Sequence, residues 1–200
     1  RELRERGFQR IYQWTRGVDA DSFHPDAPPA LKDLPRPVFM YVGRVSVEKN
    51  IEAFLALDLP GTKVVVGDGP ALATLEERYP GVVFTGNKHG PELTAHYTSA
   101  DVFVFPSLTD TWGLVLMEAL ACGVPVAAYP IMGPRDVIGD SGVGVLDWDL
   151  QKACLAALDI PRDACRAYAE RFSWAESAKQ FLTNVLHANE VYHGRMPAEA

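Results

Sequence analysis

The sequence predicts an α/β fold: a Rossmann-like parallel sheet covered by helices on both faces, with extra helices toward the carboxyl end. Two observations predict it. Short apolar runs alternate with helical patterns from residue 38 to residue 146. The runs are continuously apolar, which is typical of parallel strands buried on both faces. Because the carboxyl ends of such strands share one edge of the sheet, ligands are expected there.

β-branched and apolar residues locate the strands, and apolar residues at helical spacing locate the helices between them. We expect strands at Val38–Val42, Lys63–Val66, Val82–Thr85, Val102–Phe105, Val124–Ala128 and Gly144–Leu146. We expect intervening helices at Asn50–Leu57, Ala71–Tyr79, Glu92–Tyr97 and Leu114–Ala121.

The two ends of the chain differ from this repeating part. A short charged helix is expected over Arg1–Gln9 and a strand over Arg10–Trp14, followed by a proline-rich connector. After residue 149 the expected elements are helices, at Gln151–Leu158, Arg162–Arg171 and Trp174–Tyr192. Ser173 and Glu176 form a capping box for the last helix. The apolar stripe of that helix is expected to pack into a core.

Composition excludes several classes of protein. The formal net charge of −7 weighs against a nucleic-acid-binding protein, which would usually show a basic face. No apolar run approaches the roughly 20 residues that span a bilayer. The three cysteines form no CxxC pair and the five histidines have no metal-ligand spacing, so we expect reduced cytoplasmic thiols and no metal site.

Glycine and two cations follow the first strand. Gly43, Arg44 and Lys49 lie in the turn before the helix at Asn50. A helix start offers free N–H groups and partial positive charge, Arg can clamp oxygens and Lys adds a point charge. The pattern suits a diphosphate, although two solvated surface cations would look the same.

Glycine-rich turns also follow the second and third strands. Gly67 and Gly69 are not followed by a third glycine three residues later, so the dinucleotide fingerprint of oxidoreductases is absent and a tight turn is the simpler interpretation. After the third strand, the loop with Asn87 and Lys88 could present backbone groups to a nucleobase or be a plain surface loop.

Two carboxylates, Asp110 and Glu118, follow the fourth strand. Between them Trp112, Gly113 and Leu114 mark a helix start, whose amides could face an anionic or sugar oxygen. Glu118 lies about 7 Å along the helix axis from Gly113, so the two acids suit different parts of one long ligand. They could also be a helix-dipole acid and an exposed Glu. However, a carboxylate among apolar neighbours needs a partner.

Five segments together resemble the family 4 retaining glycosyltransferases, which have the two-domain GT-B fold: GVDADSFHP, YVGRVSVEKNIEAF, VVVGDGP, VVFTGNKHGPELTAHYTSADVFVFPS and TDTWGLVLMEALACGVPVAA. The resemblance covers nearly the whole chain but only the family's second, donor-binding half. It implies that residues 1–16 are a remnant of the N-terminal acceptor domain and that 17–37 are the interdomain linker. Residues 38–172 would then be the nucleotide-sugar-binding domain, and 173–200 a C-terminal helix and tail.

The resemblance also implies roles for the candidate residues. Arg44 and Lys49 would bind the donor diphosphate, Glu118 the ribose, and Asp110 the transferred sugar at the reacting face. Asp110, Arg44 and Lys49 would be the catalytic residues. The further implied donor-binding positions are Gly43, Gly67, Asn87, Lys88, Trp112, Gly113 and Leu114. The family usually has Glu where this chain has Asp110, and the identity of the sugar depends on that difference.

The implied reaction is the retaining transfer of a mannose- or glucose-type hexose from a UDP- or GDP-hexose to an acceptor hydroxyl. No metal or cofactor is expected, because the cations and the helix start would stabilise the departing diphosphate. The glycan or lipid acceptor would bind through the missing domain, so the chain alone would bind donor but catalyse little. A lipid acceptor would place the whole enzyme at the inner membrane face. A stand-alone nucleotide-sugar-binding or regulatory module and a sugar-nucleotide epimerase are the alternatives.

Overall fold

A computed structural model describes residues 2–110 and 112–194 of the 200-residue chain. It divides the chain into two compact units. One is residues 18–171, and the other combines residues 1–17 with residues 172–200. The larger unit carries the sheet, and the smaller one consists of the two ends of the chain. The functional assignment of domains inferred from the sequence stays a prediction.

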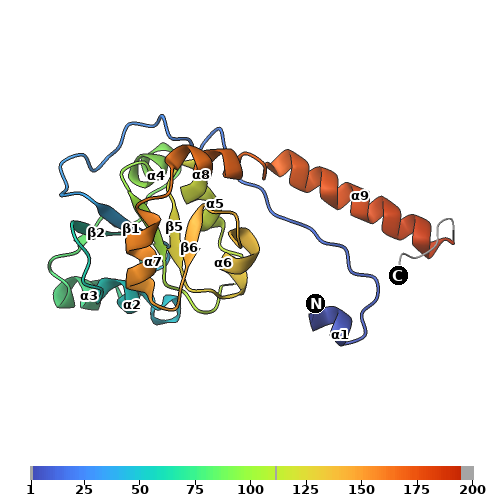
Figure 1. Cartoon of the computed structure of the whole chain (residues 1–200), viewed down its shortest axis with the longest axis horizontal. Helices are drawn as coiled ribbons and strands as arrows, with labels where there is room; N and C mark the ends of the chain where they lie inside the picture. The colour runs from blue at the N-terminus through green and yellow to red at the C-terminus, as the bar shows by residue number, and fades with distance from the viewer. Residues whose placement is uncertain (1, 111, 195–200) are drawn as a thin grey trace. The chain divides into compact units, whose positions relative to one another are not determined.

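The larger unit is built on a six-stranded parallel sheet in the order β3-β2-β1-β4-β5-β6 (Figure 1). The strands are β1 (Val38–Val42), β2 (Thr62–Val66), β3 (Val83–Phe84), β4 (Val102–Phe105), β5 (Val126–Ala128) and β6 (Gly144–Leu146). The predicted fold class is therefore confirmed. β2 and β3 lie on one side of β1, and β4 begins the other side, so the strand order reverses between β1 and β4. Ligands of open α/β sheets bind at such a switch point.

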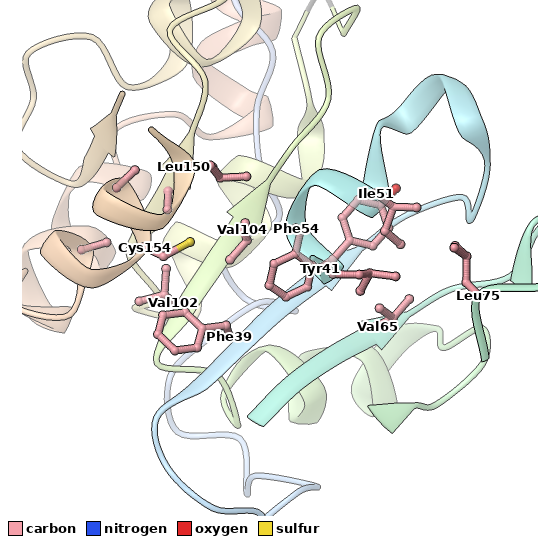
Figure 2. Close-up of a cluster of buried hydrophobic side chains, with 14 of the residues drawn as sticks. Phe39, Tyr41, Ile51, Phe54, Val65, Leu75, Val102, Val104, Leu150 and Cys154 are labelled. Carbon is pink, nitrogen blue, oxygen red and sulfur yellow. The ribbon is translucent and has the colours of Figure 1, made fainter. Parts of the chain in front are cut away.

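Alternate residues of each strand supply the two buried faces. Phe39, Tyr41, Val65, Val102 and Val104 form one core with Leu75 and with side chains from two further helices (Figure 2). The helices are α2 (Ile51–Leu55) and α7 (Leu150–Ala157). Because every residue of β1 and β4 is buried, the strands read as continuous apolar runs.

The opposite face of the sheet packs against other helices. Phe103 of β4 lies 5.9 Å, between ring centroids, from Tyr97 at the end of α4 (Gly90–Tyr97). On this side α5 (Leu114–Ala121) also packs against α8 (Arg162–Ala169). Helices therefore cover both faces, and the helices that follow strands start near the carboxyl edge.

Two short elements were not expected from the sequence. Residues Val47–Lys49 form a single 3₁₀ turn, η1, and Met132–Val137 form a short helix, α6. Gly133 and Pro134 lie in the first turn of α6, where a missing N–H costs nothing because the first amides of a helix lack intrahelical partners. The remaining helix of this unit, α3, covers Leu72–Arg78.

The connector contains no helix or strand between residues 19 and 37, as its prolines predict. It is nevertheless fixed to the rest of the larger unit by hydrogen bonds near the end of α4. The amide of Ala30 donates to the carbonyl of Ala95 at 2.9 Å, and that of Leu31 donates to Oγ of Ser99 at 3.0 Å.

The smaller unit corrects two expectations. The helix near the start, α1, covers only Glu2–Glu5, and residues 10–14 are not a strand. A strand needs a sheet neighbour, whereas this segment hydrogen-bonds to side chains of α9 (Trp174–Tyr192). The carbonyl of Gln13 accepts from Nδ2 of Asn184 at 2.7 Å, and Nε1 of Trp14 donates to Oγ of Ser177 at 3.1 Å.

Helix α9 begins as the capping box predicts, because the amide of Glu176 donates to Oγ of Ser173 at 3.1 Å. The expectation that its apolar stripe is buried is wrong. Phe181, Leu182 and Leu186 are each more than half exposed. Among the described residues of the smaller unit, the short segment before residue 18 covers part of the stripe, as where the Trp14 and Phe181 rings lie 5.2 Å apart between centroids, and leaves the rest exposed.

Candidate functional site

The loops after β1, β2 and β3 are joined by backbone hydrogen bonds at the carboxyl edge of the sheet. The amide of Gly43 donates to the carbonyl of Val66 at 3.0 Å, and that of Gly67 donates to the carbonyl of Gly86 at 2.9 Å. A Cβ on Gly67 would lie 1.9 Å from the carbonyl oxygen of Gly43, and its φ is +145°. Glycine is therefore required at position 67 for the loops to approach one another.

A buried tyrosine stabilises the turn after β1 through a hydrogen bond. The hydroxyl of Tyr41 donates to the backbone carbonyl of Arg44 at 2.8 Å. Burial, with a smaller contribution from the charges of Asp110 and Glu48, raises the pKa of Tyr41 far above its usual value. The hydroxyl therefore stays protonated and keeps donating to the turn.

Lys49 and Asp110 meet across the switch point. Nζ of Lys49 lies 2.7 Å from Oδ1 and 2.9 Å from Oδ2 of Asp110. Both side chains are about three-quarters buried. Burial opposes ionisation of Asp110, but hydrogen bonds from Lys49 and Ser107 and the charge of Lys49 outweigh it and lower the pKa of the carboxyl. Asp110 is thus an ionised acid facing a cation.

Asn50 connects the same two loops. Its Nδ2 donates to the carbonyl of Pro106, directly after β4, at 3.0 Å. Its backbone is left-handed, with φ of 52°, a conformation that Asn tolerates better than most residues. This residue ends η1 and begins α2, and so aims Lys49 at Asp110.

Arg44 does not join this pair in the structure. Its side chain is 65% exposed, and its guanidinium lies 3.8 Å from the carboxylate of Glu48, whose side chain is also largely exposed. Such an exposed pair holds the side chain only weakly. Arg44 is therefore free to turn toward an anion at the edge of the sheet.

The start of α5 lies in the loop that carries Asp110. Gly113 is its N-cap, with a left-handed backbone at φ of 73°, and Leu114 is its first residue. The amides of a first helical turn have no intrahelical partner and attract negatively charged oxygens. Trp112 precedes them, and Thr111 lies outside the described residues.

Glu118 has its own partner on a neighbouring helix. The hydroxyl of Tyr97 donates to Oε2 of Glu118 at 2.8 Å. Burial raises the pKa of Glu118, and the hydrogen bond from Tyr97 offsets only part of that effect. The two acids predicted from the sequence thus have different partners, which fits separate tasks rather than a shared proton.

The loop after β3 presents polar side chains as well as backbone. Nδ2 of Asn87 lies 3.0 Å from Nε2 of His89, and Lys88 pairs with Glu92 at 2.8 Å. Asn87 is exposed, whereas Lys88 is largely covered. The structure brings this loop to the β2 loop through Gly86 but gives Asn87 and Lys88 no contact to Lys49 or Asp110.

Two buried polar atoms in the described part of the chain lack a hydrogen-bond partner: Oγ of Ser46 and Nε1 of Trp112. Such groups are uncommon in folded proteins and call for a specific explanation. Both lie in the two loops that carry Lys49 and Asp110. The two loops therefore contain polar atoms without hydrogen-bond partners at the place where a ligand is expected.

Tyr97 and Asn50 are the site residues whose roles the sequence did not reveal. Tyr97 reads as one more apolar helical residue, and only the need of Glu118 for a partner pointed to it. Asn50 stood at the expected helix start, where its tolerance of a left-handed backbone was the available signal.

Within residues 2–110 and 112–194, no helix has both the length and the apolar character needed to cross a bilayer. Nor do those residues bring three His, Cys, Asp or Glu side chains together in a way that could hold a metal ion.

The family described as "Glycosyl transferases group 1" matches residues 36–160. The chain belongs to the group 1 glycosyl transferases. That match contains Lys49, Asp110, Tyr97 and Glu118, and so the whole of the site described above.

Curated relatives of this glycosyltransferase domain include a "GDP-mannose-dependent alpha-mannosyltransferase" of Mycobacterium tuberculosis, 39% identical over 70% of the chain and 39% of the relative. A "D-inositol 3-phosphate glycosyltransferase" of Mycolicibacterium smegmatis is 30% identical over 92% of the chain and 49% of the relative. The chain thus matches less than half of the length of these two enzymes.

Among solved structures, the lipopolysaccharide galactosyltransferase WaaB shares the fold with a TM-score of 0.75 and 20% identity, covering 94% of the chain and 59% of WaaB. A sucrose-phosphate synthase from Thermosynechococcus elongatus has a TM-score of 0.72 and 27% identity, covering 87% of the chain and 52% of the synthase.

Proposed function

We propose that the chain is the donor-binding half of a retaining hexosyltransferase that uses a nucleotide-diphosphate sugar. The observation that carries this proposal is the contact between Lys49 and Asp110 at the switch point of a group 1 glycosyltransferase sheet. A diphosphate needs a cation, and a sugar needs an acceptor for its hydroxyls. Lys49 offers the cation and Asp110 offers the acceptor, and the two groups lie within hydrogen-bond distance of each other.

The donor would lie along the carboxyl edge from β3 to β4. In this arrangement its base lies at the loop with Asn87 and Lys88, and its ribose hydroxyls donate to Glu118. The diphosphate lies between Gly43, Gly67 and the cations Lys49 and Arg44. The sugar lies at Asp110 and at the amides of Gly113 and Leu114.

Three side chains around this edge support the arrangement. Arg44 is exposed, and buried polar atoms of Trp112 and Ser46 lack a hydrogen-bond partner, so each side chain can still form a polar contact with a ligand.

The chemistry follows from where charge develops. As the bond between sugar and diphosphate breaks, the leaving group gains negative charge beside Lys49, Arg44 and the start of α5. Positive groups fixed at that position lower the barrier, because they stabilise the transition state more than the ground state. We therefore propose transfer without a metal ion, with Asp110 orienting the sugar.

The names of the relatives favour a GDP-mannose donor for this chain. Three curated relatives at 37–39% identity are called GDP-mannose-dependent alpha-mannosyltransferases. The match to less than half of their length supports a whole enzyme of two domains, in which another domain supplies the glycan or lipid acceptor. On this proposal the chain alone binds donor and transfers little sugar, in the cytoplasm or at the inner membrane face.

Calorimetric titration of the 200-residue chain with GDP, UDP, GDP-mannose and UDP-glucose tests the proposal. We expect saturable binding of a nucleotide diphosphate, tightest for GDP and GDP-mannose, and unchanged by EDTA. Glu118→Ala should weaken whichever nucleotide binds, and Glu77→Ala on the exposed side of α3 is the matched control. Failure of all four ligands to bind would refute the donor-binding role. Rapid sugar transfer by the chain alone would refute its dependence on another domain.

A further inference from the structure

An aromatic pair lies on the side of the carboxyl edge that the proposed donor leaves unused. Tyr129 directly follows β5, and Trp148 follows β6 by two residues. Their ring centroids are 5.8 Å apart, with an angle of 31° between the ring planes. Trp148 is 66% exposed, although burying an indole would be favourable. The exposed face of this large ring, packed against a second ring, is an apolar surface available to a ligand.

The sheet topology fixes where this pair lies relative to the donor. The proposed nucleotide positions follow β3, β2, β1 and β4, with the sugar at Asp110 after β4. β5 and β6 continue the sheet in the opposite direction from the nucleotide, with Phe105, Ala128 and Leu146 in register across β4, β5 and β6. Tyr129 therefore lies one strand spacing and Trp148 two spacings, about 5 and about 10 Å, from the line of β4 on the side away from β1.

The backbone around Trp148 is fixed while its ring stays exposed. Oδ1 of Asp147 accepts from the amide of Asp149 at 3.0 Å, and Oδ1 of Asp149 accepts from the amide of Lys152 at the start of α7 at 3.0 Å. Nζ of Lys152 also donates to Oδ2 of Asp147 at 2.6 Å. The ring is thus presented by an ordered turn, which lowers the entropy cost of binding a ligand.

A polar hollow is lined by residues close in sequence to the pair, although neither Tyr129 nor Trp148 lines it. It has a volume of about 650 Å³, within the range of small-molecule sites. The strand β6 and Pro130, the residue after Tyr129, line it together with Arg135 and Asp140. Guanidinium donors and carboxylate acceptors match sugar hydroxyls, which both donate and accept. Independently of the hollow, the exposed aromatic face of Trp148 suits the apolar C–H face of a pyranose, because the ring face is electron-rich.

We propose that Tyr129 and Trp148 form a stacking platform for a hexopyranose ring of a glycan, lying beyond the donor sugar and away from the nucleotide. The inference rests on the proposed function, since that function places the donor on the other half of the edge. The platform holds a glycan unit near the reacting centre and selects acceptors that carry a sugar ring at this distance. Tyr129 and Trp148 are binding residues and take no part in bond breaking.

Titration of the 200-residue chain with α-linked mannobiose and with maltose tests this. The probe is the indole N–H signal of Trp148 in a ¹H–¹⁵N spectrum, identified by its loss in Trp148→Phe. We expect a saturable shift of that signal with at least one disaccharide. Trp148→Ala should weaken binding tenfold or more, measured on neighbouring backbone signals, and Trp148→Phe should stay within threefold of the wild type. Trp174→Ala, which removes another half-exposed indole, is the matched control and should change nothing.

The outcomes separate the platform from the donor site. Absence of saturable disaccharide binding, or equal affinity in Trp148→Ala and the wild type, overturns the platform. GDP or UDP titrated into the same variants should bind as in the wild type. Disaccharide binding without any nucleotide binding would overturn the proposed function instead, and would leave a sugar-binding surface of another purpose.

Discussion

The ammonium of Lys49 contacts both carboxylate oxygens of Asp110, at 2.7 and 2.9 Å, across the point where the strand order of the sheet reverses. Each side chain is therefore held in place by the other. A donor that binds here must share Lys49 between its diphosphate and Asp110. The pair can consequently act as one positioned unit, with the cation facing the phosphate and the acid facing the sugar.

Substitutions at Lys49 and Asp110 should have different effects on GDP binding. Lys49→Met should weaken GDP binding by about ten- to a hundredfold, because hydrogen bonds to charged groups contribute about 1.5–3 kcal/mol. Asp110→Asn should leave GDP affinity equal or raise it, since it frees the ammonium from a competing anion. Calorimetry with GDP measures both. A parallel loss in the two variants would show that the pair acts only by supporting the loops.

The same pair should separate sugar from nucleotide recognition. Asp110→Asn should remove whatever additional affinity GDP-mannose has over GDP, because the carboxylate is the proposed acceptor of sugar hydroxyls. Asp110→Glu keeps the charge and adds one methylene, and it should change the preference between GDP-mannose and UDP-glucose more than the affinity for GDP. An unchanged difference between GDP-mannose and GDP in Asp110→Asn would remove Asp110 from the sugar site.

The hydrogen bond between Tyr97 and Glu118 should contribute to the free energy of unfolding. Tyr97 is fully buried, and its hydroxyl is the hydrogen-bond donor to a largely buried carboxylate. Tyr97→Phe leaves that carboxylate with one partner fewer, so we expect a loss of about 1–3 kcal/mol in the free energy of unfolding, measured by urea denaturation. Tyr79→Phe is the control, because the Tyr79 hydroxyl lies 3.5 Å from the exposed Glu52 and should cost little.

Hydrophobic pattern predicted the sheet because its strands are buried on both faces. β4 and α5 were predicted with the bounds that they have, since an apolar run ends at Pro106 and a helical pattern begins after Gly113. The strand expected at residues 10–14 failed for a physical reason. Pattern shows that a segment is apolar and extended, but not whether a neighbouring strand is present to pair with it.

The candidate site was predictable in its residues but not in its contacts. Strand ends show which side chains share an edge, so Lys49 and Asp110 could be placed together. Side-chain pairs between elements depend on helix rotation and loop path, which one sequence does not contain. The hydrogen bond between Tyr97 and Glu118 and the turn at Asn50 are therefore seen only in the structure.

The raised pKa of Glu118 predicts a specific pH dependence. In the folded chain this carboxyl binds a proton more tightly than in the unfolded chain, because burial penalises its charge. Its contribution therefore favours folding at low pH and declines as pH rises from the unfolded pKa, about 4.3, through the raised folded value. The free energy of unfolding of the wild type, measured relative to Glu118→Gln, should increase as pH falls from neutral. A difference independent of pH would show that Glu118 is not perturbed.

Gly67 should be the least replaceable glycine of the site. A Cβ there would lie 1.9 Å from the carbonyl oxygen of Gly43, and the positive φ adds backbone strain. Gly67→Ala should therefore lower the free energy of unfolding by about 1–3 kcal/mol and weaken nucleotide binding, because the loops after β1 and β2 must separate. Gly81→Ala is the matched control, since nothing lies within 4 Å of the added Cβ. Equal stability of the two variants in urea denaturation would mean that the close approach of these loops is not needed for folding, and unchanged GDP affinity in Gly67→Ala would mean that it does not shape the diphosphate site.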